Sequence, residues 1–249
     1  MDAVENAAGN YIFLPGIEPF SSGAAAMPGH EVVHGVLRTP VPWRQGFALI
    51  DRHLNAAGRP RQALCGIELR CPAPMSLDGF AEFNAGYREL LSDWEILLDD
   101  INPVARTNVS PVVGPPDETL LYGFSYTVPA EDTPRTFVGA GGGETTGGGL
   151  GGIVREGDTS AGAMAAKSAR VMEIMQARLS GLGMDWGDVT AVNVYTAVTD
   201  ASYLAAQLVE KIGAHAVHGV HWYLSRPPIV GLDFEMDLRG YRQKLWLDT

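Results

Sequence analysis

The chain has 249 residues, 46% of them hydrophobic and 19% charged, which is enough for one large domain or two smaller ones with a buried core. Its net charge of −11 argues against nucleic acid or an anionic membrane surface as a partner. No apolar stretch approaches the ~18 residues of a membrane span, so we expect a soluble, cytoplasmic protein. Cys65 and Cys71 lie about 20 Å apart along one predicted strand, too far for a disulfide between them.

The first half of the chain predicts a helix, a strand, a second helix and a closing strand, in that order. Residues 43–57 carry apolar side chains at helical spacing and stop at Gly58. An alternating strand follows at 65–71, and a second helix at 79–91. The closing strand presents one apolar face, formed by Leu120, Tyr122, Phe124 and Tyr126.

Before that closing strand, Arg106 stands in a short β-branched run after Pro103, with no acidic residue close to it in sequence. A guanidinium offers a rigid fork of donors that fits a carboxylate bidentately. Because this arginine lies on a predicted strand rather than a flexible loop, the pattern indicates a fixed anion receptor. The alternative is an arginine at a strand edge that pairs with a distant acid or meets water.

The second half repeats the order of the first. Residues 161–180 predict a helix, Val192 and Val194 mark a strand, and 201–212 predict a less regular helix. The last strand has an apolar face made of Leu232, Phe234, Met236 and Leu238. We therefore expect an α+β protein built from two related units, each a mixed sheet with two helices packed on one face.

The two units are expected to cover residues 1–132 and 133–249, with a proline-containing linker at the boundary. Residues 139–152, which open the second unit, are rich in glycine. They lack the Gly-Lys-Ser/Thr ending of a phosphate loop, and no acid stands at the distance that a dinucleotide fold requires. We predict a mobile hairpin or lid there and no nucleotide cofactor.

Acidic residues suggest where proton transfer takes place. Asp233, Glu235 and Asp237 share one face of the last strand, opposite its apolar face. A solvated sheet face is one interpretation; the other is a buried face whose carboxyls have shifted pKa values or arginine partners. Glu144, in the glycine-rich stretch, is a second candidate for a general acid.

Other polar residues give weaker indications. Asn84 lies on the apolar stripe of the helix at 79–91, where its amide needs partners, and we predict that it fixes nearby backbone. His215, His218 and His221 recur every three residues, but no metal-binding motif accompanies them, so we expect no metal.

Several short motifs occur together and in order within residues 11–130. They are Ser22-Gly23, Gln45, Ala57-Gly58, Phe83-Asn84-x-x-Tyr87 and Pro103-Val104-Ala105-Arg106-Thr107. With these motifs the segment resembles the Rid/YjgF family of enamine/imine deaminases. The second half resembles the same fold more weakly, through residues 182–195 and its closing strand.

The resemblance implies two tandem chorismate-mutase-like domains that assemble as a homotrimer, with ligand clefts between neighbouring domains. In family members that deaminate, the arginine after this proline holds the carboxylate of a 2-imino acid while water attacks the imine carbon and ammonia leaves. That arginine is Arg106 here, and His218 takes the equivalent position in the second half. Glu235 lies near the place where active members carry a glutamate on the last strand, so a working site requires the two halves to meet.

We therefore expect a cofactor-independent hydrolytic deaminase of a small imino or enamino carboxylate, for example one like 2-aminomuconate. The candidate catalytic residues are Arg106, Glu235 and Glu144, and the candidate substrate-binding residues beside Arg106 are Asn108, Tyr122 and His218. Two alternatives remain: a chorismate-type lyase or hydrolase on the same scaffold, or a non-catalytic protein that binds small carboxylates. An acid beside the arginine distinguishes the deaminase from the binding protein.

Overall fold

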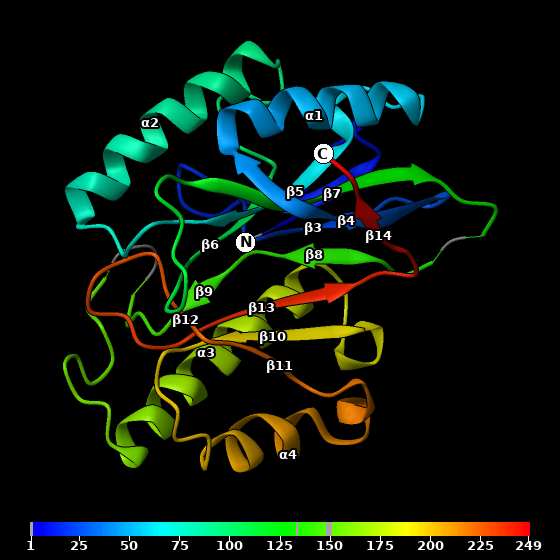
Figure 1. Cartoon of the computed structure of the whole chain (residues 1–249). Coiled ribbons are helices and arrows are strands. Elements are labelled where there is room, and N and C mark those ends of the chain that lie inside the picture. The colour runs from blue at the N-terminus through cyan, green and yellow to red at the C-terminus, as the bar shows by residue number, and fades with distance from the viewer. Residues whose placement is uncertain (1, 133, 148–150) are drawn as a thin grey trace.

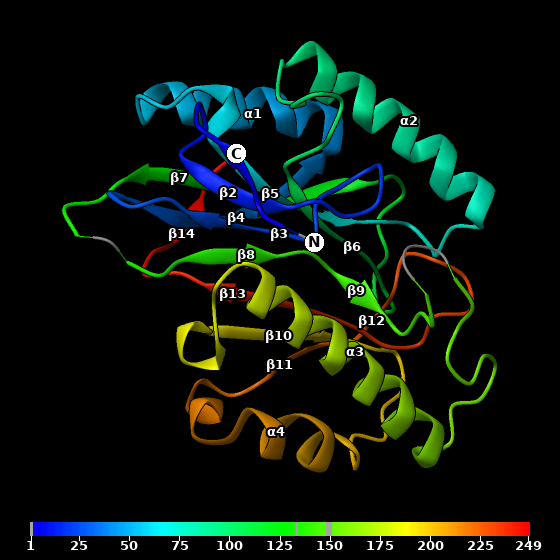
Figure 2. The ribbon, with the colours of Figure 1, turned by 180° about the vertical axis from the view of Figure 1, so that it is seen from behind.

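The structure is a computed structural model that describes residues 2–132, 134–147 and 151–249. Two β-sheets face each other, and helices cover their outer faces (Figure 1). The helices α1 (Trp43–Ala56) and α2 (Leu77–Asp93) cover one sheet, while α3 (Ala161–Gly181) and the short α4 (Glu210–Ile212) cover the other, as Figure 2 shows from behind. This arrangement confirms the predicted α+β class, with helices packed on one face of each mixed sheet.

The first sheet contains six strands within the described residues, and its pairs β5–β6 and β14–β4 are parallel. In spatial order the strands are β12 (Ser225–Arg226), β6 (Ala105–Pro111), β5 (Leu64–Arg70), β7 (Leu120–Pro129), β4 (His30–Pro42) and β14 (Lys244–Leu247).

The second sheet has eight strands in the same part of the chain, and its β10–β11 pair is parallel. Seven of them follow the order β1 (Val4–Asn6), β2 (Tyr11–Leu14), β3 (Gly23–Ala26), β8 (Phe137–Gly139), β13 (Glu235–Gly240), β10 (Ala191–Tyr195) and β11 (His221–Tyr223). The eighth, β9 (Gly142–Gly143), pairs with β13.

Each half of the chain lends strands to the other half's sheet. The N-terminal strands β1 to β3 pair on to β8 in the second sheet, while β12 and β14 join the edges of the first. The helices divide at the predicted boundary, but the strands cross it in both directions. The boundary itself stays a prediction, and residue 133 lies outside the described residues.

The helices form where apolar spacing predicts them. Phe47, Ile50 and Leu54 of α1 are buried in the core beneath it. The two longest helices, α2 and α3, begin at serine caps. The Ser76 hydroxyl accepts from Gly79 N at 3.1 Å, and the Ser160 hydroxyl accepts from Ala163 N at 3.3 Å.

Shorter helical turns lie at Arg61–Ala63, Trp186–Asp188, Ala205–Val209 and Gly213–His218. The irregularity expected at 201–212 is found there, because Ala205–Val209 is a π-helix that leads into α4. None of the helices in the described residues is both long and apolar enough to cross a membrane.

The prediction of which residues form the apolar face of β7 is wrong at the start of the strand. The register between β5 and β7 shifts between Glu68 and Leu69, which reverses the alternation of β7 at that point. Leu121 therefore joins Phe124 and Tyr126 in the core under the helices. Tyr122 points to the other side, where its ring lies 3.7 Å from the guanidinium carbon of Arg70.

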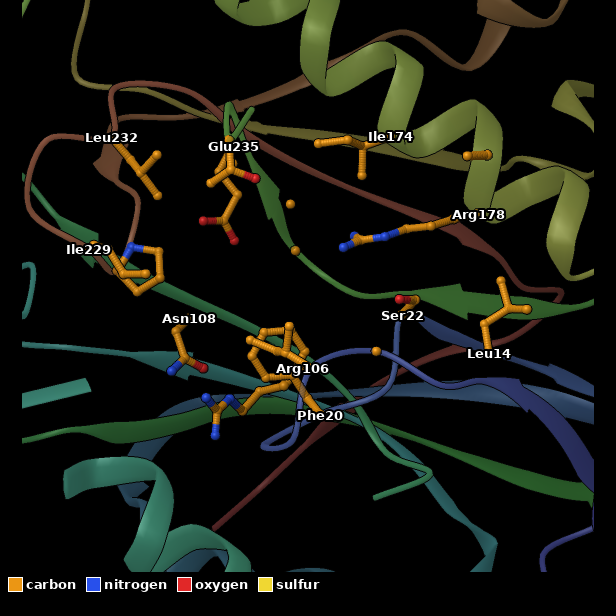
Figure 3. A pocket seen from close by; sticks show the side chains of 18 of the residues that line it. Leu14, Phe20, Ser22, Arg106, Asn108, Ile174, Arg178, Ile229, Leu232 and Glu235 are labelled. Carbon is orange, nitrogen blue, oxygen red and sulfur yellow. The ribbon is translucent and has the colours of Figure 1, made fainter. Parts of the chain in front are cut away.

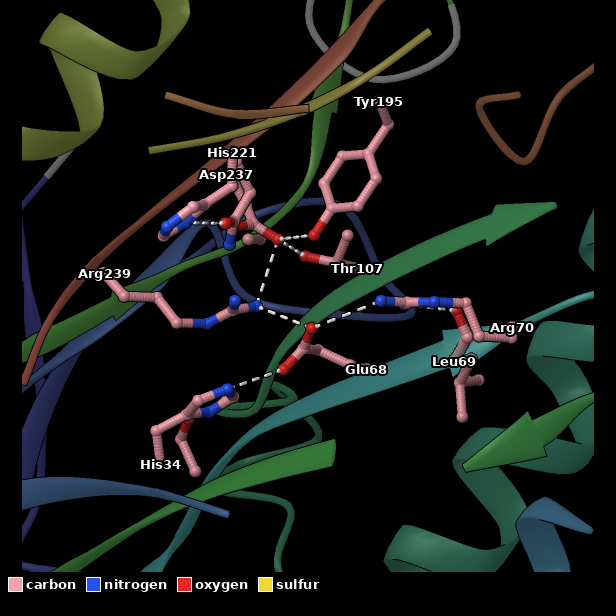
Figure 4. A network of polar contacts seen from close by, with 12 residues as sticks. His34, Glu68, Leu69, Arg70, Thr107, Tyr195, His221, Asp237 and Arg239 are labelled. Atoms are coloured by element: carbon pink, nitrogen blue, oxygen red, sulfur yellow. Dashed lines mark hydrogen bonds and ion pairs between the residues drawn. The ribbon is translucent and has the colours of Figure 1, made fainter. Parts of the chain in front are cut away.

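The acidic face of β13 lies between the two sheets, so its interpretation as a solvated face is wrong. Glu235 is 3% exposed and Asp237 is fully buried. Asp237 accepts hydrogen bonds from Thr107 (2.8 Å), Asn193 (2.7 Å) and Tyr195 (2.9 Å). Because Thr107 belongs to β6, Asp237 links the two sheets directly (Figure 4).

Arg239 extends this buried network. Its Nη2 lies 3.0 Å from Asp237 Oδ2 and 3.4 Å from Glu68 Oε2, and so joins β13 to β5. Burial opposes its positive charge, but the carboxylates of Asp237 and Glu68 outweigh burial and raise the pKa of Arg239. On the far side of Glu68, His34 Nε2 lies 3.2 Å from its Oε1 (Figure 4). Burial lowers the pKa of His34 well below its usual range, so this histidine is neutral at neutral pH.

Arg239→Met should lower the free energy of unfolding by about 3–5 kcal/mol, because it leaves two buried carboxylates without their shared cation. Urea unfolding of the variant and the wild type measures the difference. Arg38→Met is the control: that side chain is 67% exposed and pairs with the exposed Asp248, so its loss should change stability little. Equal effects of the two variants would contradict a stabilising role for the network.

Candidate active site

A cavity of about 570 Å³ opens where the two halves meet, and both contribute to its wall (Figure 3). The first half supplies residues of the loop at 14–22, Phe80 of α2, and Arg106 and Asn108 of β6. The second half supplies Glu235 of β13, Arg178 of α3 and the backbone of the glycine-rich stretch at 141–143. The remaining wall is largely apolar and includes Leu14, Ile17, Phe20, Ile229 and Leu232.

Arg106 is held rigidly at this cavity. Its side chain is only 3% exposed, and its guanidinium carbon lies 4.5 Å from the ring centre of Tyr87 and 5.0 Å from that of Phe20. One guanidinium nitrogen, Nη2, donates to Asn84 Oδ1 at 2.5 Å. The other, Nη1, is buried and has no hydrogen-bond partner in the described residues. Asn84 therefore orients the arginine side chain, rather than the backbone as predicted.

Arg106 stays positively charged although its side chain is buried. Burial lowers the pKa of Arg106 to about 10, and Tyr87, Cys71 and Glu235 partly oppose this effect. At neutral pH the group is a cation. No carboxylate of the described chain lies within ion-pair distance of it, so a buried positive charge faces the cavity without a neutralising partner.

Asn108 lies two residues beyond Arg106 on the same strand, and hence on the same face. It is 3% exposed, and neither its Oδ1 nor its Nδ2 has a partner among the described residues. Unpaired buried polar atoms are rare in folded proteins. Together with Arg106 Nη1, they provide two donors and one acceptor at a single place in the wall.

Glu235 brings a carboxyl group to the same cavity from the other half. Burial, and then the charge of Asp237, raises the pKa of Glu235 well above the ordinary value, while Arg178 works in the opposite direction. A carboxylic acid in this state can hold a proton near neutral pH and give it up to a substrate. A side chain at Gly141 would collide with the Glu235 carboxyl group, so glycine there lets Glu235 keep its position at the cavity.

Arg178 is a cavity residue that the sequence analysis missed. Its Nη1 donates to Ala140 O at 2.5 Å. Burial lowers the pKa of Arg178 to about 10, an effect that Glu235 and Asp237 partly oppose. The signal was present in the sequence: Arg178 follows Val171 by seven residues and Met175 by three, which places it on the apolar stripe of its helix.

The other predicted site residues lie elsewhere. Glu144 is buried, but its two carboxylate oxygens accept from the backbone N of Asp233 (2.7 Å) and of Phe234 (3.1 Å), and Lys167 Nζ lies 3.4 Å away. Burial raises the pKa of Glu144. The group fastens the glycine-rich stretch to α3 and to the residues just before β13, and it is not part of the cavity wall.

His218 and Tyr122 are also absent from the cavity wall. His218 ends an exposed helical turn, and Tyr122 packs on Arg70 between the sheets. Among the described residues, no three or more His, Cys, Asp or Glu side chains are grouped so as to hold a metal ion. The structure thus brings together Arg106, Asn108 and Glu235 from the predicted set.

The start of the glycine-rich stretch is not the predicted mobile hairpin. Residues Phe137–Gly139 and Gly142–Gly143 are strands paired with β13. Residues 141–143 form part of the cavity wall. The part of the predicted lid at 148–150 lies outside the described residues.

Comparison with known proteins identifies the family to which this chain belongs. Residues 3–245 match the family described as 2-aminomuconate deaminase CnbZ. The chain belongs to this family. It is 38% identical, over 244 residues and 96% of each chain, to a 2-amino-5-chloromuconate deaminase from Comamonas testosteroni.

Two solved structures were found to be similar to all or part of this family member. A chorismatase superposes with a TM-score of 0.55 at 12% identity, covering 96% of this chain and 79% of that one. The YjgF gene product from E. coli gives a TM-score of 0.33 at 15% identity, over 43% of this chain and 81% of that one. The chorismatase likeness supports the chorismate-mutase-like character of the fold.

Glu235→Gln should stabilise this family member increasingly as pH rises. The folded-state pKa of Glu235 lies above the unfolded value of about 4.3. Below that value the carboxyl is protonated in both states; above it the wild type loses stability until pH passes the folded-state pKa. Chemical unfolding across this range measures the gain. Glu118→Gln, at an exposed position, controls for the loss of one surface carboxylate. A gain for Glu235→Gln that is independent of pH would contradict the raised pKa.

Proposed function

We propose that this protein is a hydrolytic deaminase of 2-aminomuconate or a close relative, with its reaction centre in the cavity between the halves. The observation that carries the proposal is the convergence of Arg106, Asn108 and Glu235 on one cavity. Family membership and the name of the 38% identical relative support the substrate class.

Arg106 and Asn108 suit the carboxylate beside the reacting nitrogen. Nη1 of Arg106 and Nδ2 of Asn108 are donors without partners, and a carboxylate accepts both. Oδ1 of Asn108 is left to accept from the substrate N–H. The aromatic rings around Arg106 and its bond to Asn84 fix the geometry before substrate arrives, which lowers the entropic cost of positioning.

Glu235 then acts as the general acid and the general base. As an acid, it protonates the enamine carbon and gives an imine. As the resulting carboxylate, it accepts a proton from water while the water oxygen bonds to the imine carbon. Transfer of that proton to the nitrogen, with uptake of the hydroxyl proton by the Glu235 carboxylate, lets the C=O bond form as the C–N bond breaks. Ammonia leaves, a 2-oxo acid remains, and Glu235 is protonated again. General acid–base catalysis of this kind contributes about 10²–10⁴-fold. These steps use side chains and water, in line with the expectation that no cofactor is needed.

The assembly belongs to the same proposal. We take residues 1–132 and 133–249 as diverged copies of one unit, supported by the repeated order of their helices and strands. The Arg106 position in the first copy corresponds to His218 in the second, which lies away from the cavity. One reaction centre per chain follows, within a cytoplasmic homotrimer as the Rid/YjgF resemblance implies.

Arg106→Met should lower the rate of ammonia release from 2-aminomuconate by roughly 10²-fold or more, since the carboxylate loses its receptor. Arg106→Lys should recover only part of the rate, because it restores the charge without the fork. Arg61→Met, which disrupts an exposed pair with Asp51, should behave like the wild type.

Glu235→Gln separates the deaminase from a binding protein. It should lose turnover while still binding the substrate, because the amide keeps the shape of the side chain and lacks the proton. Circular dichroism confirms that each variant is folded. Wild-type turnover by folded Arg106→Met, or the absence of ammonia release by the wild-type protein, would contradict the proposal.

A further inference from the structure

Two arginines from different layers of the structure reach the one cavity. Arg106 comes from β6 and Arg178 from α3 (Figure 3). A third arginine of the wall, Arg170, is already neutralised, because its Nη1 lies 2.9 Å from Glu173 Oε2. Neither Arg106 nor Arg178 has a carboxylate within ion-pair distance in the described chain.

The cavity therefore holds an excess of positive charge in apolar surroundings. Leu14, Ile174 and Leu232 are among the side chains around these groups. A charge withdrawn from water is costly unless it is paired and hydrogen-bonded. Glu235, which lines the same cavity, offers little compensation, because burial favours its neutral form.

The guanidinium of Arg178 is fixed where it can receive a ligand. Its Nη1 is bonded to Ala140 O, and a side chain at Gly142 would come within 3.0 Å of that nitrogen. Glycine at 142 thus leaves the guanidinium room beside the backbone. In the described residues, Ala140 O is the one acceptor bonded to Arg178, so donors remain for an incoming anion.

We infer that Arg178 is the receptor for a second carboxylate, and that the cavity selects substrates with a carboxylate at each end of a short apolar chain. This inference rests on the proposed function and deepens it. Muconate has this form, with a conjugated chain between two carboxylates. Arg106 holds the carboxylate next to the reacting nitrogen, Arg178 holds the distal one, and the apolar wall packs on the chain between them. A monocarboxylate of the same length leaves one guanidinium of the cavity wall without an anionic partner.

The alternative is that Arg178 only fastens α3 to the glycine-rich stretch through Ala140 O. In that case its loss affects all ligands alike. Adipate and hexanoate distinguish the two roles, because they share a flexible six-carbon chain and differ in one terminal carboxylate.

Titration calorimetry at neutral pH should show that the wild type binds adipate about 10- to 100-fold more tightly than hexanoate, as expected for one charge-assisted bond. Arg178→Met should abolish this preference and leave hexanoate binding within about threefold of the wild type. Arg178→Lys should keep part of the preference, and it serves if the methionine variant does not fold. Arg106→Met should weaken the binding of both ligands.

Either of two results would overturn the inference. One is an unchanged preference for adipate in Arg178→Met, or in Arg178→Lys if only that variant folds. The other is the absence of any preference in the wild type. These measurements require no turnover. A wild type that prefers adipate but releases no ammonia from 2-aminomuconate would refute the proposed deaminase and leave the second receptor standing. Rapid turnover without a preference for adipate would do the reverse.

Discussion

Buried charges between the two sheets link the sheets to each other and bring an acid to the cavity. Asp237 and Arg239 point inward from β13 and have polar partners on both sheets. Glu235, two residues earlier on the same face, has no such partner and lies at the cavity. The charge of Asp237 also helps to raise the pKa of Glu235. One strand thus supplies both the link between the sheets and the acid of the candidate site.

The exchange of strands keeps the site together. Arg106 and Glu235 are far apart in sequence, and they meet because β6 and β13 lie in sheets that face each other. The strands β1 to β3, β12 and β14 tie each half to the other half's sheet, so the halves cannot separate without breaking backbone hydrogen bonds. A rigid frame of this kind suits a site that depends on fixed distances between a guanidinium and a carboxyl.

Local sequence patterns predicted much of the fold and some of the site. Apolar spacing located α1, α2 and α3, and an arginine without acidic neighbours pointed to Arg106. Tyr122 was misplaced because a shift of register depends on the pairing between strands, which one strand's alternation does not record. The burial of Glu235 and Asp237 depends on a second sheet covering them, and the same alternating pattern describes a solvated face equally well.

Arg178 was missed although its position on the helix could be read from the sequence. Its place on the apolar stripe of α3 was visible, but a long charged side chain there usually extends to solvent. Only the tertiary structure shows that the stripe ends at a cavity with a second unpaired arginine. The position of Glu144 beside Lys167 likewise follows from the contact between α3 and the glycine-rich stretch, which no local pattern contains.

The central claim is that residues of both halves act on one substrate in one cavity. A crystal structure of the protein with bound muconate tests it most directly. The account predicts one carboxylate within hydrogen-bond distance of Arg106 and Asn108, with the carbon chain beside Glu235. Muconate bound instead near His218 or Tyr122, away from Arg106 and Glu235, would contradict it.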